Sequence, residues 1–188
     1  MSLRVISGSA KGRKLKPVPG DASRPIMDRV KEALFNILGS SVRDTRWLDL
    51  FAGTGSVGIE ALSRGAASCL FLDTNRLAIR TIHENLEHTR LKERAELRRA
   101  DAFAYLASDP PPGVTFEVIY VAPPQYVGLW SKALQAIDAR PAWLSPDGLA
   151  IAQIDPKEYE PLELETLELF DQRKYGNTML CFYERPGE

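Results

Sequence analysis

The sequence predicts an α/β fold with a doubly wound parallel sheet of seven strands, the last two of which form an antiparallel hairpin. Short apolar runs alternate with helical patterns between residues 45 and 154, which is the order expected for a chain of βαβ units. A glycine-rich turn at 53–58 joins the first of these strands to a helix. The last part of the chain instead has two strand patterns around a turn, so the parallel sheet is expected to end in a hairpin.

The first 27 residues are predicted to form a basic arm that precedes the main domain at 28–188. Two short strand candidates, 4–6 and 13–16, flank a flexible basic turn and would pair as a β-hairpin. Prolines and a glycine at 17–25 then interrupt regular structure. The arm is therefore a short extension rather than a domain.

A helix is predicted from Asp28 to Leu38. Apolar residues recur there at helical spacing, Asp28 is expected to cap the first turn, and Gly39 follows the end. This helix is expected to pack on the sheet core, residues 45–188.

The core alternates strands and helices, and it ends in two further strands. The predicted strands span residues 47–50, 68–72, 96–99, 116–121, 149–154, 162–169 and 179–183. The predicted helices between them span residues 57–64, 75–91, 102–107 and 127–139. Residues 162–169 alternate apolar and acidic side chains, as a half-exposed strand does. Such an ending differs from the usual dehydrogenase arrangement.

Composition predicts one cytoplasmic domain of ordinary size. The chain has 188 residues, and 44% of them are hydrophobic. Its apolar runs fall far below the roughly 20 residues that span a membrane, and its start lacks the apolar core of a signal peptide. Cys69 and Cys181 lie in separate apolar strand patterns without a neighbouring Cys or His. We therefore expect buried thiols in a reducing compartment, with no disulfide and no metal site.

The net charge of −1 conceals a polarity along the chain. Residues 1–31 carry eight Lys and Arg against two Asp, whereas from Ala100 onward 14 Asp and Glu face 6 Lys and Arg. Such asymmetry is typical of a basic arm that binds a polyanion, and also of a locally basic surface that has no partner.

The strand–turn–helix around 47–64 carries the strongest functional signal. Gly53 and Gly55 let the backbone turn sharply and let a ligand approach it, and Gly58 lets the helix pack closely on the sheet. This spacing also fits the dinucleotide fingerprint. Asp49, just before the turn, distinguishes the two ligands, because a carboxylate is unfavourable beside a pyrophosphate and favourable beside an ammonium or sulfonium. The loop therefore favours S-adenosylmethionine over NAD.

Acidic residues also follow the next two strands. Asp73 is placed to accept both ribose hydroxyls, and Asp101 to accept the adenine amino group beside the Ala102 backbone N–H. An aspartate at such a position is equally typical of a helix N-cap, but three at successive strand ends beside a glycine loop indicate a cofactor site. The predicted cofactor residues are Asp49, Phe51, Gly53, Thr54, Gly55, Asp73, Thr74, Asp101 and Ala102.

The fourth predicted strand is followed by a loop with two consecutive prolines, which stiffen it and fix the direction of its carbonyls. At this point the chain resembles the RsmD family, bacterial methyltransferases that modify the exocyclic N2 amino group of one guanine in 16S ribosomal RNA. The resemblance covers nearly the whole chain, and its marks are residues 4–8, 12–15, 24–25, 28–36, 48–58, 60–66 and 175–176. It implies the class I S-adenosylmethionine-dependent methyltransferase fold, a Rossmann-like sheet with a terminal hairpin.

The family's loop usually reads Asp or Asn, then Pro-Pro, then Tyr or Phe. A side-chain oxygen and a backbone carbonyl that each accept one N–H localise the lone pair of an exocyclic amine, and the aromatic ring stacks on a base taken out of its helix. In this chain Ala122 offers no side-chain acceptor, and the aromatic is displaced by one place to Tyr126. Gln125 brings a nearby amide oxygen. The predicted target-base residues are Ala122, Pro123, Pro124, Gln125 and Tyr126.

The resemblance implies an enzyme that methylates guanine N2 in 16S rRNA, within an assembling 30S subunit or as naked RNA, and we expect it to act in the cytoplasm as a monomer. Alternatives are a non-catalytic RNA-binding or assembly protein, which Ala122 favours, and methylation of adenine N6. An NAD dehydrogenase fits worst, since no acid or base for hydride transfer is evident. The predicted RNA-binding residues are Arg4, Lys11, Arg13, Lys14, Lys16 and Arg24.

Overall fold

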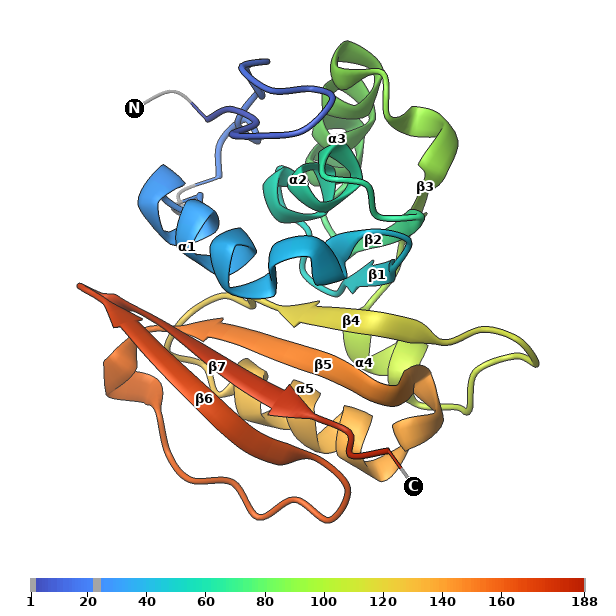
Figure 1. Cartoon of the computed structure of the whole chain (residues 1–188), viewed down its shortest axis with the longest axis vertical. Coiled ribbons are helices and arrows are strands. Elements are labelled where there is room, and N and C mark those ends of the chain that lie inside the picture. The colour runs from blue at the N-terminus through green and yellow to red at the C-terminus, as the bar shows by residue number, and fades with distance from the viewer. Residues whose placement is uncertain (1–2, 22–24, 188) are drawn as a thin grey trace. The chain divides into compact units, whose positions relative to one another are not determined.

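The computed structural model describes residues 3–21 and 25–187, and the chain divides into two compact units, Met1–Ala100 and Asp101–Glu188 (Figure 1). Each unit contains helices and part of the strand pattern. The predicted division into an arm at 1–27 and a methyltransferase domain at 28–188 stays a prediction.

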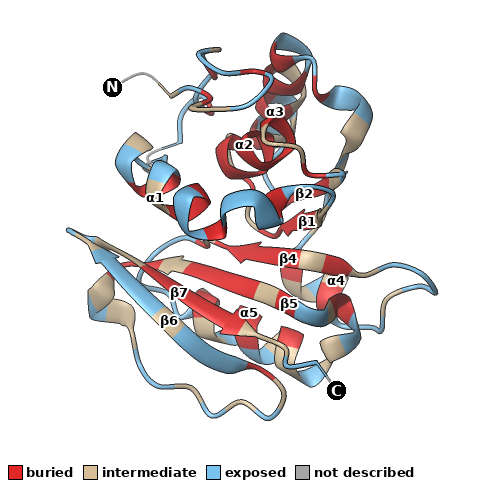
Figure 2. Ribbon diagram, in the orientation of Figure 1, coloured by how far each residue is buried: buried red, intermediate tan, exposed pale blue. Residues whose placement is uncertain are grey.

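The first unit alternates helices with three parallel strands. Its elements are α1 (Asp28–Leu38), η1 (Gly39–Val42), β1 (Arg46–Asp49), α2 (Ser56–Ser63), β2 (Ser68–Asp73), α3 (Arg76–Thr89), η2 (Lys92–Arg94) and β3 (Ala95–Arg99). Strand β2 lies between β1 and β3 and pairs with both in parallel. Each residue of α2 is buried, as Figure 2 shows. Phe35 of α1 stacks on Trp47 of β1 with ring centroids 5.6 Å apart, so α1 packs on this part of the sheet.

The second unit has four strands. Its elements are α4 (Ala102–Leu106), β4 (Phe116–Val121), α5 (Leu129–Ala139), η3 (Pro141–Trp143), β5 (Leu144–Ile154), η4 (Pro156–Glu158), β6 (Glu168–Tyr175) and β7 (Thr178–Glu184). Strand β4 pairs with β5 in parallel, whereas β7 pairs antiparallel with both β5 and β6. In Figure 2, β4, β5 and β7 are largely buried and β6 is mostly exposed. Seven strands in the described residues and a terminal antiparallel hairpin confirm the predicted fold class.

The N-terminal arm turns back on itself, but its pairing is shorter than predicted. In the described part of the arm, Arg4 and Lys14 form one isolated antiparallel bridge instead of two strands. The reason lies beyond Val5, where the backbone N–H groups of Ile6 and Ser7 donate to the carboxylate of Glu60. Because a side chain accepts these hydrogen bonds, the two N–H groups are not available for pairing between strands.

Helix α1 has the predicted bounds, but Asp28 does not cap it. The N-cap residue is Met27, which has no side-chain capping bond. Asp28 is the first helical residue, and its carboxylate instead accepts a hydrogen bond from the Arg4 side chain at 2.9 Å. The acidic side chain in the first turn still favours the helix dipole.

The predicted strand at 162–169 is wrong, because β6 begins only at Glu168. Asp138, at the end of α5, accepts backbone N–H groups from Glu165, Thr166 and Leu167 at 2.7–2.9 Å. Burial opposes the charge of Asp138, but these hydrogen bonds prevail and lower its pKa. A carboxylate therefore takes the donors that a strand would have offered to a neighbour.

Strand β5 begins at Leu144, before the predicted start at 149. Residues 146–148 have the composition of a turn, and Asp147 has a positive φ of 61°. The chain remains in the sheet because Asp147 and Gly148 exchange backbone hydrogen bonds with Arg185. A bulge against β4, between Phe116 and Val118, absorbs the irregularity.

Both cysteines, Cys69 and Cys181, are buried free thiols, as predicted, and burial raises the pKa of each. Over the described ranges, no helix combines the length and apolar character that crossing a membrane requires.

Candidate active site

The glycine loop between β1 and α2 has the backbone that its sequence predicts. Gly53 and Gly55 adopt positive φ values of 56° and 78°. A Cβ on Gly53 would meet no atom within 4 Å, so the loop is open there to an approaching ligand. A Cβ on Gly58 would lie 2.3 Å from Cε1 of Phe71, so this glycine lets α2 pack on β2. The sharp turn at Gly53 and Gly55 and the close packing at Gly58 are thus as expected, and the binding of a ligand against the loop stays a prediction.

Asp73, the last residue of β2, is tied to the loop. Its Oδ2 accepts the Gly53 backbone N–H at 2.9 Å, and its Oδ1 accepts the Asn75 backbone N–H at 2.9 Å. These bonds fix the plane of the carboxylate. Because each carboxylate oxygen has two lone pairs, both oxygens retain acceptor capacity for hydroxyl groups. Thr74, which follows, is exposed.

Asp49, the last residue of β1, is the most unusual group in the first unit. It is 2% exposed, and its Oδ1 has no hydrogen-bond partner. Burial, reinforced by the negative charge of Asp73, raises the pKa of Asp49 to about 7. A buried carboxylate oxygen without a partner is costly unless a ligand completes it. Its chemistry fits the cationic end of S-adenosylmethionine, and the open glycine turn fits a ligand lying against the backbone.

Asp101, in the second unit, caps α4, since its Oδ2 accepts the Ala104 backbone N–H at 2.8 Å. Asp101 is exposed, whereas Ala102, the next residue, is buried. Of the two interpretations open for Asp101, the cap is thus observed, and its role toward adenine stays a prediction.

The target loop, residues 122–128, follows β4 in the second unit. Pro123 is buried, whereas Pro124, Gln125 and Tyr126 are exposed. Tyr126 has a positive φ of 64°. Its backbone N–H donates to Glu158 and its hydroxyl donates to Asp155, so two acidic side chains hold the displaced aromatic.

The basic arm contains two kinds of cation. Arg4 pairs with Asp28, Arg13 donates to the backbone carbonyl of His88 at 3.0 Å, and Lys16 pairs with Glu84 at 3.0 Å. Lys11 and Lys14 are exposed and show no ion pair within the described part of the chain. Arg24 lies outside the described residues. Among the predicted RNA-binding residues that the structure describes, Lys11 and Lys14 are therefore the two whose side chains have no partner within the described chain, and their binding to RNA stays a prediction.

A buried network that the sequence analysis missed anchors this arm. Lys31 and Glu60 are fully buried with Nζ and Oε2 3.5 Å apart, and Lys31 also donates to Ser56 and to the Arg4 carbonyl. Burial lowers the pKa of Lys31, although Glu60 opposes this shift. The helical pattern of α1 could have indicated that Lys31 is buried. Lys31 lies three positions before Leu34 and therefore on the apolar face of the helix.

Asn85 of α3 was also missed, and it connects the arm to the glycine loop. Its Oδ1 accepts the Lys16 backbone N–H at 2.7 Å, and its Nδ2 donates to the Thr54 carbonyl at 3.0 Å. A single buried amide thereby fixes both segments. No local pattern indicates such a role.

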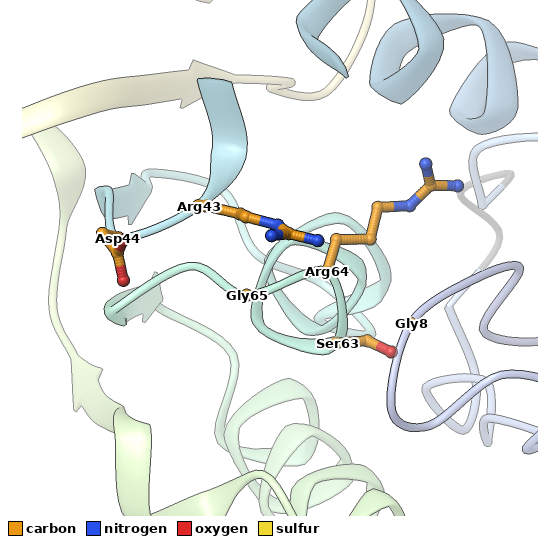
Figure 3. Close-up of a pocket in the computed structure, with 6 residues that line it drawn as sticks. All are labelled: Gly8, Arg43, Asp44, Ser63, Arg64 and Gly65. Atoms are coloured by element: carbon orange, nitrogen blue, oxygen red, sulfur yellow. The ribbon is translucent and has the colours of Figure 1, made fainter. Parts of the chain in front are cut away.

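An open hollow lies where α2 ends (Figure 3). In Figure 3 the Arg43 side chain extends toward Arg64, whereas the Asp44 carboxylate points away. The Arg64 side chain already has partners within the protein, because it donates to Glu60 at 2.9 Å and lies over the Phe35 ring. The hollow contains none of the predicted cofactor residues, and its lining residues are Gly8, Arg43, Asp44, Ser63, Arg64 and Gly65. Elsewhere in the described chain, no three His, Cys, Asp or Glu side chains are grouped to hold a metal ion.

Comparisons with known proteins agree with this architecture. The chain is 39% identical over 185 residues to YlbH of Bacillus subtilis (strain 168), named as a candidate rRNA methyltransferase, and the match covers 98% of this chain and 100% of YlbH. It is 32% identical over 183 residues to Ribosomal RNA small subunit methyltransferase D of Haemophilus influenzae, covering 93% of this chain and 94% of that protein.

A solved structure is also similar. It is the 16S rRNA N2 methyltransferase RsmC of Thermus thermophilus in complex with AdoMet and guanosine, with a TM-score of 0.75 and 25% identity over 98% of this chain and 50% of that one. Finally, the family model described as Conserved hypothetical protein 95 matches residues 3–184. The chain therefore belongs to the Conserved hypothetical protein 95 family, which is the RsmD family that its motifs resemble.

Proposed function

We propose that this protein is an S-adenosylmethionine-dependent methyltransferase that modifies the exocyclic N2 amino group of a guanine in 16S ribosomal RNA. The single observation that carries the cofactor assignment is the buried Asp49 with its unpartnered Oδ1 before an open glycine turn. The substrate assignment is supported by the relatives named as rRNA methyltransferases and by the similar enzyme that binds guanosine.

In the first unit, the chain's own groups match the parts of the cofactor. Asp49 supplies a negative charge in a buried position, where it is favourable beside an ammonium or a sulfonium. Asp73 offers two oriented oxygens to a pair of hydroxyls, and the glycine turn lets a ligand lie against the backbone. When bound, S-adenosylmethionine supplies a methyl group on a sulfonium that a weak nucleophile can accept.

In the second unit, the target loop supplies acceptors for an amine. The prolines hold the Ala122 and Pro123 carbonyls in fixed directions, and Gln125 adds an exposed amide oxygen. An amine whose N–H groups are accepted there has its lone pair localised. Tyr126 offers an exposed ring, 63% accessible, on which an extruded base can stack.

The basic arm suits the phosphates of the RNA. Lys11 and Lys14 are exposed on a segment fixed by the buried Lys31–Glu60 pair, so the phosphate contacts have a rigid base. We further propose that the protein acts as a monomer in the cytoplasm on an assembling 30S subunit, and that it needs no metal.

The test is methylation with isotope-labelled cofactor. Under-modified small ribosomal subunits and naked 16S rRNA are incubated separately with the protein, and the labelled nucleoside is then identified and mapped. We expect one N2-methylguanosine. Label on adenine N6 would overturn the assignment to guanine N2 and show that the enzyme methylates a different amino group.

One observation favours a second candidate, a non-catalytic RNA-binding protein. Ala122 lacks the side-chain acceptor that the family loop usually has. The intact Asp49, Asp73 and glycine turn favour the enzyme, since a simple binder has no use for a cofactor site. Tight RNA binding without any transfer of label would establish the binder.

A further inference from the structure

We propose that Asp155 and Glu158 are positioning residues that clamp Tyr126, the displaced aromatic of the target loop, in the orientation that the reaction uses. This inference rests on the proposed function and concerns the same loop. The family resemblance assigns no role to either acidic residue.

The strand order of the second unit brings the clamp to the loop. Strands β4 and β5 are parallel neighbours with Val121 opposite Ala152. The target loop leaves the end of β4, and Asp155 follows Ile154 at the end of β5. Because the carboxyl ends of parallel neighbours meet at one edge of a sheet, the two segments lie together.

Tyr126 needs such a clamp because its backbone is unfavourable. Its φ of 64° lies in the left-handed region, where a residue with a bulky side chain is strained. Tyr126 is also 63% exposed, so packing does not hold it there. What holds it are two hydrogen bonds, one from its backbone N–H to Glu158 and one from its hydroxyl to Asp155.

The two acidic residues are themselves fixed. They form a capping box around η4, in which Asp155 accepts the Lys157 backbone N–H at 2.9 Å and Glu158 accepts the Asp155 backbone N–H at 3.3 Å. Tyr159, the next residue, stacks on Trp130 of α5 with centroids 6.1 Å apart. Since α5 follows the target loop, the clamp is attached to the element that ends the loop.

The charges are arranged for a lasting bond. The Tyr126 hydroxyl and then the Lys157 backbone N–H lower the pKa of Asp155, which stays ionised. The hydrogen bond to Asp155 raises the pKa of the Tyr126 phenol, which stays protonated. At neutral pH a phenol donor thus faces a carboxylate acceptor, which is a strong pairing.

The clamp explains how the loop tolerates its departure from the family pattern. The family's aromatic follows Pro-Pro directly, whereas Gln125 intervenes here. An extra residue normally turns the following side chain in another direction, and the left-handed turn at Tyr126 changes that direction again. A ring held in place before the base arrives loses less freedom on binding, so the clamp should act on kcat/KM for RNA.

The experiment is a double-mutant cycle on the full chain, measuring kcat/KM for RNA. Tyr126→Phe keeps the ring and removes the donor, and Asp155→Ala removes the acceptor. Each change is expected to lower kcat/KM about tenfold, and the double variant should be no slower than the slower single variant, because both remove one bond. Asp155→Asn keeps the cap on η4, and its kcat/KM should lie between the value of the native chain and that of Asp155→Ala. Glu163→Gln, on an exposed residue outside the clamp, should leave the rate unchanged.

A spectroscopic readout tests the bond itself. With carbon-13 in the tyrosine rings, the Tyr126 phenol should titrate above its ordinary range in the native chain and closer to it in Asp155→Asn. An ordinary titration in both, or additive rate losses in the cycle, would overturn the clamp while the native chain still methylates RNA. A native chain that transfers no methyl group would instead overturn the proposed function.

Discussion

The glycine loop of the first unit and the target loop of the second place their left-handed backbone on different kinds of residue, glycine in the first and tyrosine in the second. In the glycine loop the positive φ values fall on Gly53 and Gly55, which adopt them without strain, and long-range bonds to Asp73 and Asn85 add to the local backbone bond from Gly55 to Ala52 at 2.8 Å. The target loop keeps its shape through Asp155 and Glu158, about thirty residues further along the chain. The first loop therefore makes its turn with its own glycines, whereas the turn of the second depends on two acidic partners far along the chain.

The largest expected effect tests how rigidly the first region is built. Glu60→Ala leaves Lys31 buried without its counter-ion and removes the acceptor of two backbone N–H groups. We expect the free energy of unfolding to fall by about 3–5 kcal/mol, the cost of breaking a buried pair. Urea unfolding measures it. Glu84→Ala breaks the exposed pair with Lys16 and should change stability little, so equal losses would refute the anchoring role.

A second change tests the cofactor side of the comparison. Asp73→Ala should weaken S-adenosylmethionine binding by about 1.5–3 kcal/mol, the range for hydrogen bonds to charged groups. Titration calorimetry measures the affinity, and Glu93→Ala, on an exposed residue of the same unit, is the control. Unchanged affinity in a folded Asp73→Ala protein would show that the cofactor binds at a site without Asp73.

A third change restores the family pattern in the target loop. Ala122→Asp should speed single-turnover methylation about tenfold. Removing one preorganised polar group from an oxyanion hole costs about 10²–10³ in turnover, and the gain here is smaller because the backbone carbonyls already act as acceptors. Gln125→Ala in the native background should slow it if that amide already substitutes. Cofactor affinity should not change. An active enzyme whose rate responds to neither substitution would show that the loop needs no side-chain acceptor.

The smallest expected effect concerns the arm. Lys11→Gln with Lys14→Gln should reduce the steepness of the fall in log affinity for RNA with log salt, by about 1.8 in slope on duplex and less on single strands. Arg13→Gln with Lys16→Gln should reduce this steepness less, since these cations already have partners within the chain. Filter binding across a salt series compares the pairs. Equal slopes for native and variant chains would make the arm a solvated surface.

The sequence predicted what local rules determine. β4 and α1 have the predicted bounds, and β1 and α2 lie within one residue of theirs. Strand composition, glycine positions and helical spacing act between near neighbours, so they can be read directly from the chain. For the same reason the positive φ values of Gly53 and Gly55 were foreseeable.

What the sequence could not predict depends on partners far along the chain. Residues 162–167 have an alternating pattern but no strand, because Asp138 takes their N–H groups. The left-handed turn at Tyr126 depends on Glu158, and the burial of Lys31 depends on Glu60. Each is a tertiary interaction that overrides or supplements a local preference.

The most direct test of the central claim is the pH dependence of S-adenosylmethionine binding. The pKa of Asp49 in the free protein is raised to about 7, so below that pH the carboxyl is mostly protonated. A cationic ligand favours the ionised form, and binding must then displace a proton. Calorimetry from pH 5.5 to 8 should show affinity that rises up to about tenfold per pH unit below 7 and levels above it. Asp49→Asn should bind more weakly, with little pH dependence. A native profile that matches this variant would contradict the assignment of Asp49 and its glycine turn to the cofactor.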